Sequence, residues 1–142
     1  MRKKQRIPGA IYTQSYVYNF HFHLIWTTKY RRELFTTPEL VDEMKTLLNR
    51  IAELNEITIE AMEVMPDHIH LLISFKPKLA PTTVVKAFKG ASARLFFKNH
   101  PDIKASAFWG GHLWTRSYYM STLGNMSHEV VETYIEGQRL KG

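Results

Sequence analysis

The sequence contains no cysteine. This absence excludes disulfides, thiolate zinc sites and cysteine nucleophiles, and it fits a reducing compartment. No apolar run approaches the length of a membrane span or of a signal-peptide core, and the basic start leads directly into Ile7, Pro8 and Gly9. Together these absences predict a cytoplasmic protein.

Repeats and low-complexity segments are also absent from the chain. Its 142 residues are 44% hydrophobic and 23% charged, which predicts one compact domain with a real core. Residues 1–15 carry four cations and show no clear period, so we expect a basic, flexible tail there, although an arm that grips phosphate would have the same composition. Residues 16–142 then form the single domain.

Acidic residues are fewer than basic ones. The chain has 13 Asp and Glu against 19 Lys and Arg, which gives a formal net charge of +6. Such an excess indicates a polyanionic partner, and nucleic acid is favoured over a membrane because no strongly amphipathic basic helix stands out. Charge alone does not distinguish DNA from RNA.

The spacing of apolar residues predicts regular elements in the order β-α-β-β-α-β, followed by one more helix. Thr37 and Ser127 are the expected caps of the first and last helices. This order is that of an α+β, ferredoxin-like fold, an antiparallel sheet with helices on one face. The predicted strands cover residues 16–28, 57–64, 68–75 and 113–122, and the predicted helices cover residues 38–55, 81–99 and 129–140.

Two histidines, His68 and His70, flank one isoleucine in the predicted strand 68–75. Side chains alternate along a strand, so both imidazoles face one side while the neighbouring aliphatic residues pack into the core on the other. Two neutral imidazoles side by side suit a metal ion, whose third ligand must come from elsewhere. An ordinary half-exposed sheet gives the same pattern, as with His21 and His23 on the first strand.

Tyr134 and Gln138 are four residues apart in the predicted last helix. This spacing places a phenol and an amide one above the other on the same helix face. Tyr134 is one of seven tyrosines, and an aromatic residue in an amphipathic helix is more often a packing residue. Tyr134 differs from the other tyrosines because Gln138 follows it by four residues.

Four stretches carry a resemblance to a known family. They are HLIWTTKYRR at 23–32, MPDHIHLL at 65–72, KGASAR at 89–94 and YIEGQ at 134–138. In this order the chain resembles the TnpA-type single-tyrosine transposases, small His-hydrophobic-His enzymes of minimal bacterial and archaeal insertion sequences. The resemblance implies a homodimer that cleaves and rejoins single-stranded DNA at hairpin-bearing element ends, through a 5′-phosphotyrosine intermediate and without a nucleotide cofactor.

The resemblance also implies roles for particular residues. Tyr134 matches the nucleophile, and His68, His70 and Gln138 match the ligands of a divalent metal ion. Two imidazoles and an amide oxygen suit Mg²⁺ or Mn²⁺, with Mn²⁺ better matched to imidazole, while zinc remains an alternative. One departure is Ser117, where a glycine is more usual in the family.

DNA contacts are expected from basic side chains in two places, the turn after the first strand and the exposed side of the second helix. The turn pairs cations with an aromatic residue, as proteins that bind single strands do, although a solvated turn has the same composition. Trp109 and Trp114 either stack on a base or belong to the core. The expected cationic contacts are Lys29, Arg31, Arg32, Lys86, Lys89 and Arg94.

Three other functions remain open from the sequence. A domesticated relative would keep the chemistry and process chromosomal repeat palindromes. A non-catalytic, RNA-recognition-like module would share the order of elements, but the outward positions of its third strand would carry aromatic residues where this chain has His68 and His70. A small zinc hydrolase would not need Tyr134.

Overall fold

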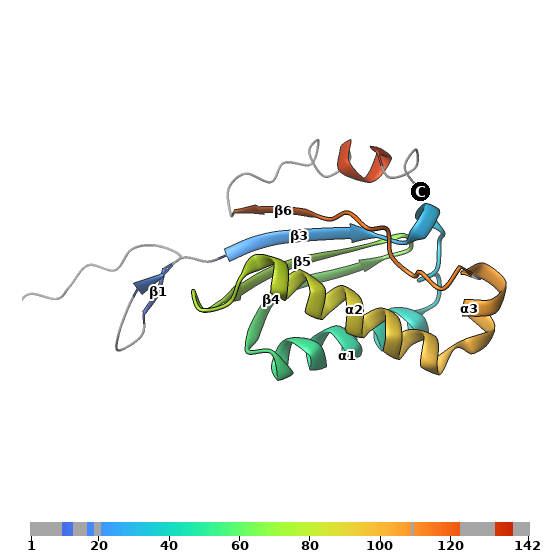
Figure 1. Cartoon of the computed structure of the whole chain (residues 1–142), viewed down its shortest axis with the longest axis horizontal. Coiled ribbons are helices and arrows are strands. Elements are labelled where there is room, and N and C mark those ends of the chain that lie inside the picture. Colours follow the sequence, from blue (N-terminus) through green and yellow to red (C-terminus); the bar gives the residue numbers. More distant parts are fainter. Residues whose placement is uncertain (1–9, 13–16, 19–20, 109, 123–132, 138–142) are drawn as a thin grey trace, which may run out of the picture.

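The computed structural model describes residues 10–12, 17–18, 21–108, 110–122 and 133–137. Its centre is a four-stranded antiparallel sheet in the order β4-β5-β3-β6 (Figure 1). The strands are β3 (His21–Thr27), β4 (Ile57–Met65), β5 (His68–Phe75) and β6 (Tyr119–Thr122). The predicted second and third strands are β4 and β5, which pair as a hairpin, and the α+β fold class is confirmed.

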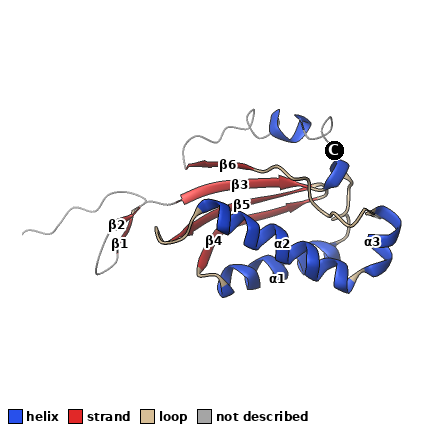
Figure 2. Ribbon diagram, in the orientation of Figure 1, coloured by secondary structure: helices blue, strands red, loops and turns tan. Residues whose placement is uncertain are grey.

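Two long helices, α1 (Pro38–Leu54) and α2 (Pro81–Asn99), cover one face of this sheet (Figure 2). Each begins at a proline, whose fixed φ suits the first helical turn. The Thr37 hydroxyl caps α1 by accepting a hydrogen bond from the Leu40 amide at 3.3 Å, as predicted. A short helix, α3 (Pro101–Ala107), was not predicted, and it begins at another proline directly after α2.

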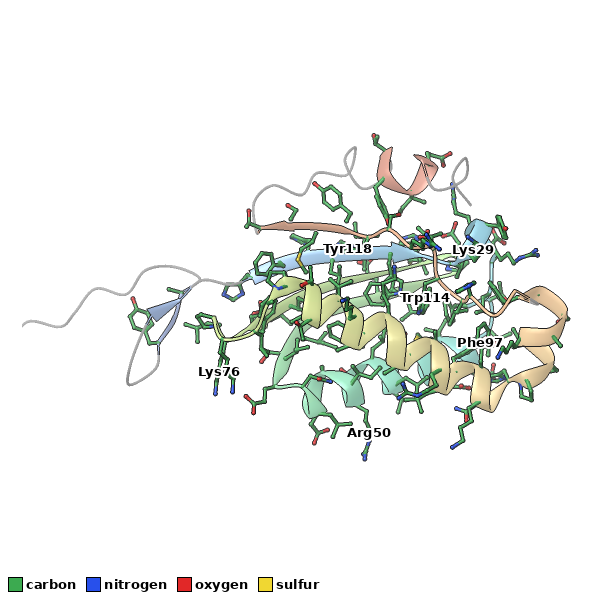
Figure 3. The ribbon with its side chains drawn as sticks, viewed as in Figure 1. Lys29, Arg50, Lys76, Phe97, Trp114 and Tyr118 are labelled. Atoms are coloured by element: carbon green, nitrogen blue, oxygen red, sulfur yellow. The ribbon has the colours of Figure 1, made fainter. Side chains whose placement is uncertain are left out.

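The core lies between the sheet and the two helices. The inward residues of β5 (Ile69, Leu71 and Ile73) are fully buried there, as their alternation predicted. Trp114 belongs to this core, because its ring packs edge-on against Trp26 with centroids 5.7 Å apart and its indole N–H donates to a buried serine hydroxyl (Figure 3). Trp114 is therefore not a platform for a base, and Trp109 lies outside the described residues.

Two predicted strands are shorter than expected. The region 16–28 is not one strand, because β2 (Val17–Tyr18) pairs with β1 (Ile11–Tyr12) in a separate sheet and β3 begins only at His21. In the region 113–122 the strand β6 begins only at Tyr119. The preceding carbonyls of residues 115–117 accept hydrogen bonds from a lysine of α2 instead of from a neighbouring strand.

The predicted tail and the predicted last helix lie partly outside the described residues. Ile11–Tyr12 is paired as β1, while residues 1–9 are not described. Residues 133–137 are helical, in agreement with the predicted helix 129–140, but Ser127 and most of that range are not described. No helix in the described part of the chain is long and apolar enough to cross a membrane.

Candidate active site

The face of the sheet away from α1 and α2 carries the two predicted histidines. His68 lies opposite Thr27 of β3, and His70 lies opposite Ile25, which in turn lies opposite Tyr119 of β6. Directly opposed residues of antiparallel strands share a face, so all five side chains belong to this outer face. Both histidines are half-buried, which confirms the predicted alternation.

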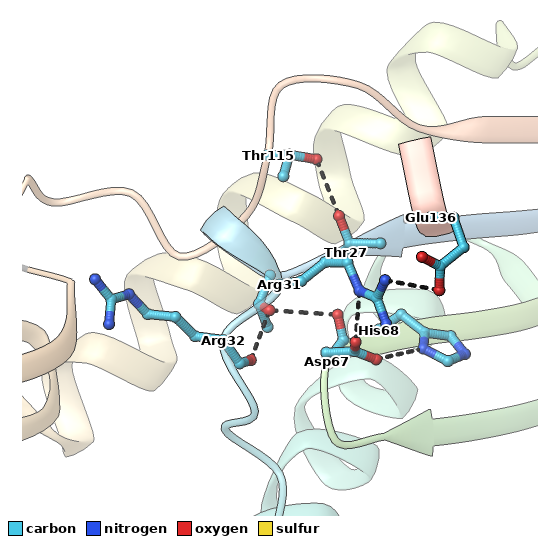
Figure 4. Close-up of polar contacts among 8 residues, drawn as sticks. Thr27, Arg31, Arg32, Asp67, His68, Thr115 and Glu136 are labelled. Carbon is cyan, nitrogen blue, oxygen red and sulfur yellow. Dashed lines mark hydrogen bonds and ion pairs between the residues drawn. The ribbon is translucent and has the colours of Figure 1, made fainter. Parts of the chain in front are cut away.

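His68 is oriented by the residue that precedes it. Its Nδ1 lies 2.8 Å from Asp67 Oδ1, and Arg31 Nε donates to Asp67 Oδ2 at 2.8 Å (Figure 4). Burial raises the pKa of Asp67, but hydrogen bonds from His68 and Arg31 outweigh it, and the net pKa is lowered. Because the ionised carboxylate accepts the Nδ1 proton, the Nε2 lone pair of neutral His68 is left available for a ligand.

His70 forms a pair with His23 rather than standing alone. His70 Nε2 lies 3.1 Å from His23 Nδ1 across neighbouring strands, so one ring donates a hydrogen bond to the other. Burial lowers the pKa of both rings, and the nearby His23 lowers that of His70 further. Both imidazoles are therefore neutral at pH 7, which is the form that binds a metal ion.

Tyr134 lies against the same sheet in the helical segment 133–137. Its ring packs on Tyr119 of β6 with centroids 5.9 Å apart, and its hydroxyl lies 3.4 Å from the Ser117 Oγ. Burial raises the pKa of Tyr134, while hydrogen bonds with the hydroxyls of Ser117 and Thr115 act in the opposite direction. At neutral pH the side chain is accordingly a phenol, which must lose its proton before it can act as a nucleophile.

Two threonines connect Tyr134 with His68 across the sheet. The Thr115 amide donates to the Thr27 carbonyl, and the two threonine hydroxyls are 3.4 Å apart. Thr27 is the partner of His68 in the next strand. Adjacent strands are spaced by about 4.8 Å, so the Thr115 backbone is about 10 Å from that of His68. The backbones of Thr115, which lies beside Tyr134, and of His68 are therefore two strand spacings apart.

Lys89 does not lie on the exposed side of α2 as predicted. Its Nζ is half-buried and donates to the carbonyls of Thr115, Arg116 and Ser117 at 2.6, 3.1 and 3.0 Å. Burial lowers the pKa of Lys89 to about 8. Helical periodicity alone misplaced this residue, because a long side chain at the edge of the apolar face can reach an adjacent loop.

The other cations expected to bind DNA differ in their surroundings. The Arg31 side chain is only 14% exposed and forms ion pairs with both Asp67 and Glu136. The distance from Arg31 Nη1 to Glu136 Oε1 is 3.1 Å. Arg32, Lys86 and Arg94 are exposed, while Lys29 is half-buried. Arg31 therefore joins the helical segment that carries Tyr134 to the loop that orients His68, a role that its position in a basic turn did not reveal.

A metal ion would find two protein ligands among the described residues of this face. His68 and His70 supply imidazoles on successive outward positions of β5. In the part of the chain that the structure describes, no three His, Cys, Asp or Glu side chains group in a way that could hold a metal ion. Gln138, which was predicted as the third ligand, lies outside the described residues.

Comparison with known proteins identifies the family. The Transposase IS200 like family matches residues 16–138. The ISDra2 transposase TnpA of Deinococcus radiodurans is 43% identical over 128 residues, which cover 90% of each chain. The transposase for insertion sequence element IS200 of Salmonella typhimurium is 27% identical over 121 residues, covering 85% of this chain and 78% of that one.

Solved structures agree with this match. A crystal structure of a Deinococcus radiodurans R1 protein described as a transposase superposes with a TM-score of 0.82 and 41% identity, over 90% of this chain and 97% of that one. A REP-associated tyrosine transposase bound to a REP hairpin has a TM-score of 0.54 and 12% identity, over 96% and 69% of the two chains, and shares the fold. The chain belongs to the IS200-like transposase family.

Proposed function

We propose that this transposase cleaves and rejoins single-stranded DNA with Tyr134 as the nucleophile and His68, His70 and Gln138 as ligands of a divalent metal ion. The observation that carries the proposal is the position of the Tyr134 hydroxyl, which lies beside Thr115, two strand spacings from His68 and on the same sheet face. A nucleophile and a metal-ligand pair that lie on one face of a sheet can act on the same phosphate.

In the proposed reaction the Tyr134 oxygen attacks the phosphorus of a phosphodiester in the DNA strand. The new bond joins the tyrosine oxygen to the 5′-phosphate, and the bond from phosphorus to the 3′-oxygen breaks. The phenol proton passes to solvent, and the departing 3′-oxygen takes up a proton. Because the phosphotyrosine conserves the phosphodiester bond energy, attack by another 3′-hydroxyl rejoins the strand without a nucleotide cofactor.

The residues around Tyr134 position the nucleophile for this step. The hydroxyls of Ser117 and Thr115 hold the phenol oxygen, and Lys89 holds the loop from which both hydroxyls come. A bound Mg²⁺ or Mn²⁺ would polarise the phosphate and neutralise negative charge in the transition state, which also favours the phenolate. His68 is fixed for ligation by its hydrogen bond to Asp67.

Binding of DNA is supported by the net charge of +6 and by the exposed cations Arg32, Lys86 and Arg94. The related REP-associated transposase was solved with a hairpin bound. We propose hairpin-bearing single strands as the substrate of this chain too, and a homodimer as the acting species. The family match favours this function over a non-catalytic RNA-binding module.

The test is a covalent adduct between protein and DNA. Wild type, Tyr134→Phe and the control Tyr118→Phe are incubated with Mn²⁺ or Mg²⁺ and a labelled single-stranded hairpin taken from the flanks of the gene. Denaturing gels should show the adduct for wild type and Tyr118→Phe. Loss of the nucleophile should reduce it by at least about 1,000-fold.

The metal requirement is tested in the same assay with a chelator and with His68→Ala, and both should abolish the adduct. Cleavage that survives Tyr134→Phe would contradict the proposal and favour a hydrolase without a covalent step. Binding of the hairpin with no adduct and no cleavage under either metal would favour a non-catalytic nucleic-acid-binding module.

A further inference from the structure

The turn that follows β3 has a strained backbone and an exposed aromatic ring. Tyr30 has φ 59° and ψ 18°, and Arg31 has φ 53°, so two consecutive bulky residues adopt the left-handed region. Backbone hydrogen bonds hold the turn, from the Arg31 amide to the Thr28 carbonyl and from the Lys29 amide to the Leu113 carbonyl. Bulky side chains rarely adopt this conformation, and such strain is concentrated at functional sites.

The Tyr30 ring is exposed to solvent and has cations around it. The ring is 61% exposed, and the Lys29 Nζ lies 5.1 Å from its centroid. The Arg32 guanidinium lies 5.8 Å from the Tyr30 centroid and 5.9 Å from that of Phe108. Cations at these distances interact with the ring face, and they also place positive charge where a bound anion would lie.

These side chains line a pocket, which we call the turn pocket, formed by Lys29, Tyr30, Arg32, Phe108 and His112. Its volume is about 260 Å³, and no acidic residue is among the described residues that line it. Flat aromatic surface combined with cations and a histidine is complementary to a nucleobase with its phosphate. A purely apolar partner would leave both cations without a counter-charge.

The turn pocket is directly connected to the active-site face. The Thr28 amide donates to the Asp67 carbonyl at 2.9 Å, and the Asp67 carboxylate orients His68. Tyr30 is two residues beyond Thr28, so their Cα atoms are separated by at most about 7 Å. The turn pocket therefore adjoins the loop that orients His68.

We propose that the turn pocket binds one unpaired base of the DNA strand that Tyr134 cleaves, with the base stacked on Tyr30 and the adjacent phosphates paired with Lys29 and Arg32. The inference rests on the proposed function for the identity of the strand. It adds a subsite that fixes which nucleotide lies next to the cleaved phosphate, separate from the residues that perform the reaction.

The test compares Tyr30→Asn with the control Tyr30→Phe. Asparagine tolerates the left-handed conformation, so it removes the ring and keeps the turn, whereas phenylalanine keeps the ring. Single abasic sites are placed in turn along the unpaired flank of a labelled hairpin oligonucleotide, and dissociation constants are measured for each oligonucleotide and protein. Thermal unfolding of both variants confirms that they fold.

At one position, removal of the base should weaken binding to wild type and to Tyr30→Phe by about tenfold. Tyr30→Asn should bind the intact oligonucleotide about tenfold more weakly and should be insensitive to the abasic site at that position. If the abasic sites weaken binding to wild type and to Tyr30→Asn equally at every position, the proposal is overturned. It is also overturned if wild type is a dimer and Tyr30→Asn, but not Tyr30→Phe, is a monomer, because Tyr30 would then lie in a protein–protein interface. This experiment measures binding and not cleavage. A failure to form the Tyr134 adduct would therefore contradict the proposed function without changing the outcome of the binding test.

Discussion

Arg31 and Arg32 are neighbours in the sequence, but their surroundings differ. The Arg31 guanidinium pairs with Asp67 and Glu136, whereas Arg32 is exposed and lies over aromatic rings. Both were expected to bind DNA, because both are arginines in the same basic turn. Their different roles depend on Asp67, which is 36 residues away in sequence from Arg31.

Replacement of Arg31 by glutamine should destabilise the fold by about 1–3 kcal/mol at neutral pH, because it leaves the largely buried Asp67 carboxylate without its cation. The pKa of Asp67 is lowered in the folded protein, so its stabilising contribution is present above the unfolded value near 3.9 and is lost as the pH falls through the lower folded value. The difference from wild type should therefore shrink in acid. Urea unfolding at pH 7 and pH 3 measures it.

Arg32→Gln is the matched control for this measurement, and it should change the unfolding free energy by no more than about 0.5 kcal/mol. Equal losses for the two variants would contradict the assignment of Arg31 to a structural ion pair.

At the scale of elements, α2 and the loop before β6 act as one unit because Lys89 joins them. One ammonium group donates to three consecutive carbonyls of the loop that carries Thr115 and Ser117. These three carbonyls belong to the part of the predicted strand 113–122 that precedes β6. A helix of the core thereby sets the position of the hydroxyls that contact Tyr134.

Lys89→Met should lower the rate of adduct formation at saturating DNA by at least about tenfold at pH 7, since a small displacement of a positioned nucleophile is costly. The pKa of Lys89 is lowered to about 8, so wild type loses the ammonium charge as the pH rises through that value. The ratio of wild-type rate to variant rate should therefore fall above pH 8. Single-turnover rates from pH 6.5 to 9.5 measure this ratio.

Lys98→Met, an exposed change in the last turn of α2, is the control and should follow wild type at every pH. A constant ratio of wild type to Lys89→Met across the pH range would show that the charge of Lys89 does not hold the loop.

The sequence predicted well those elements whose ends are marked by residues within or next to the element. Thr37 followed by Pro38 marks the start of α1, and the turn between β4 and β5 contains Pro66. The separate β1–β2 sheet and the short β6 were missed, because strand pairing and the reach of Lys89 depend on residues distant in sequence. Helix α3 was also missed, although it begins at Pro101 and proline suits the first turn of a helix.

At the scale of the whole molecule, the sequence predicted which histidines share a face but not how distant strands align. The register of β3 with β5 places His23 against His70 and Thr27 opposite His68. Thr115 joins that arrangement through Thr27. No local pattern encodes these contacts between strands. They arise when the sheet assembles, and they determine which hydroxyls surround the Tyr134 side chain.

The proposed homodimer is a prediction at this scale. Light scattering of the purified protein should give a mass of about 33 kDa, twice the 16.6 kDa of one chain. The measurement is made with and without the hairpin oligonucleotide. A mass equal to one chain under both conditions would contradict the dimer, while the roles proposed for Tyr134 and His68 would be tested separately.

The central claim is that Tyr134 becomes covalently joined to a 5′-phosphate of single-stranded DNA. The most direct measurement is digestion of the adduct formed with Mn²⁺, followed by mass spectrometry of the peptides. The account predicts that a peptide containing Tyr134 carries a nucleotide attached through its 5′-phosphate, and that His68→Ala yields no such peptide. A nucleotide on another residue, or cleaved DNA with no modified peptide, would contradict the claim.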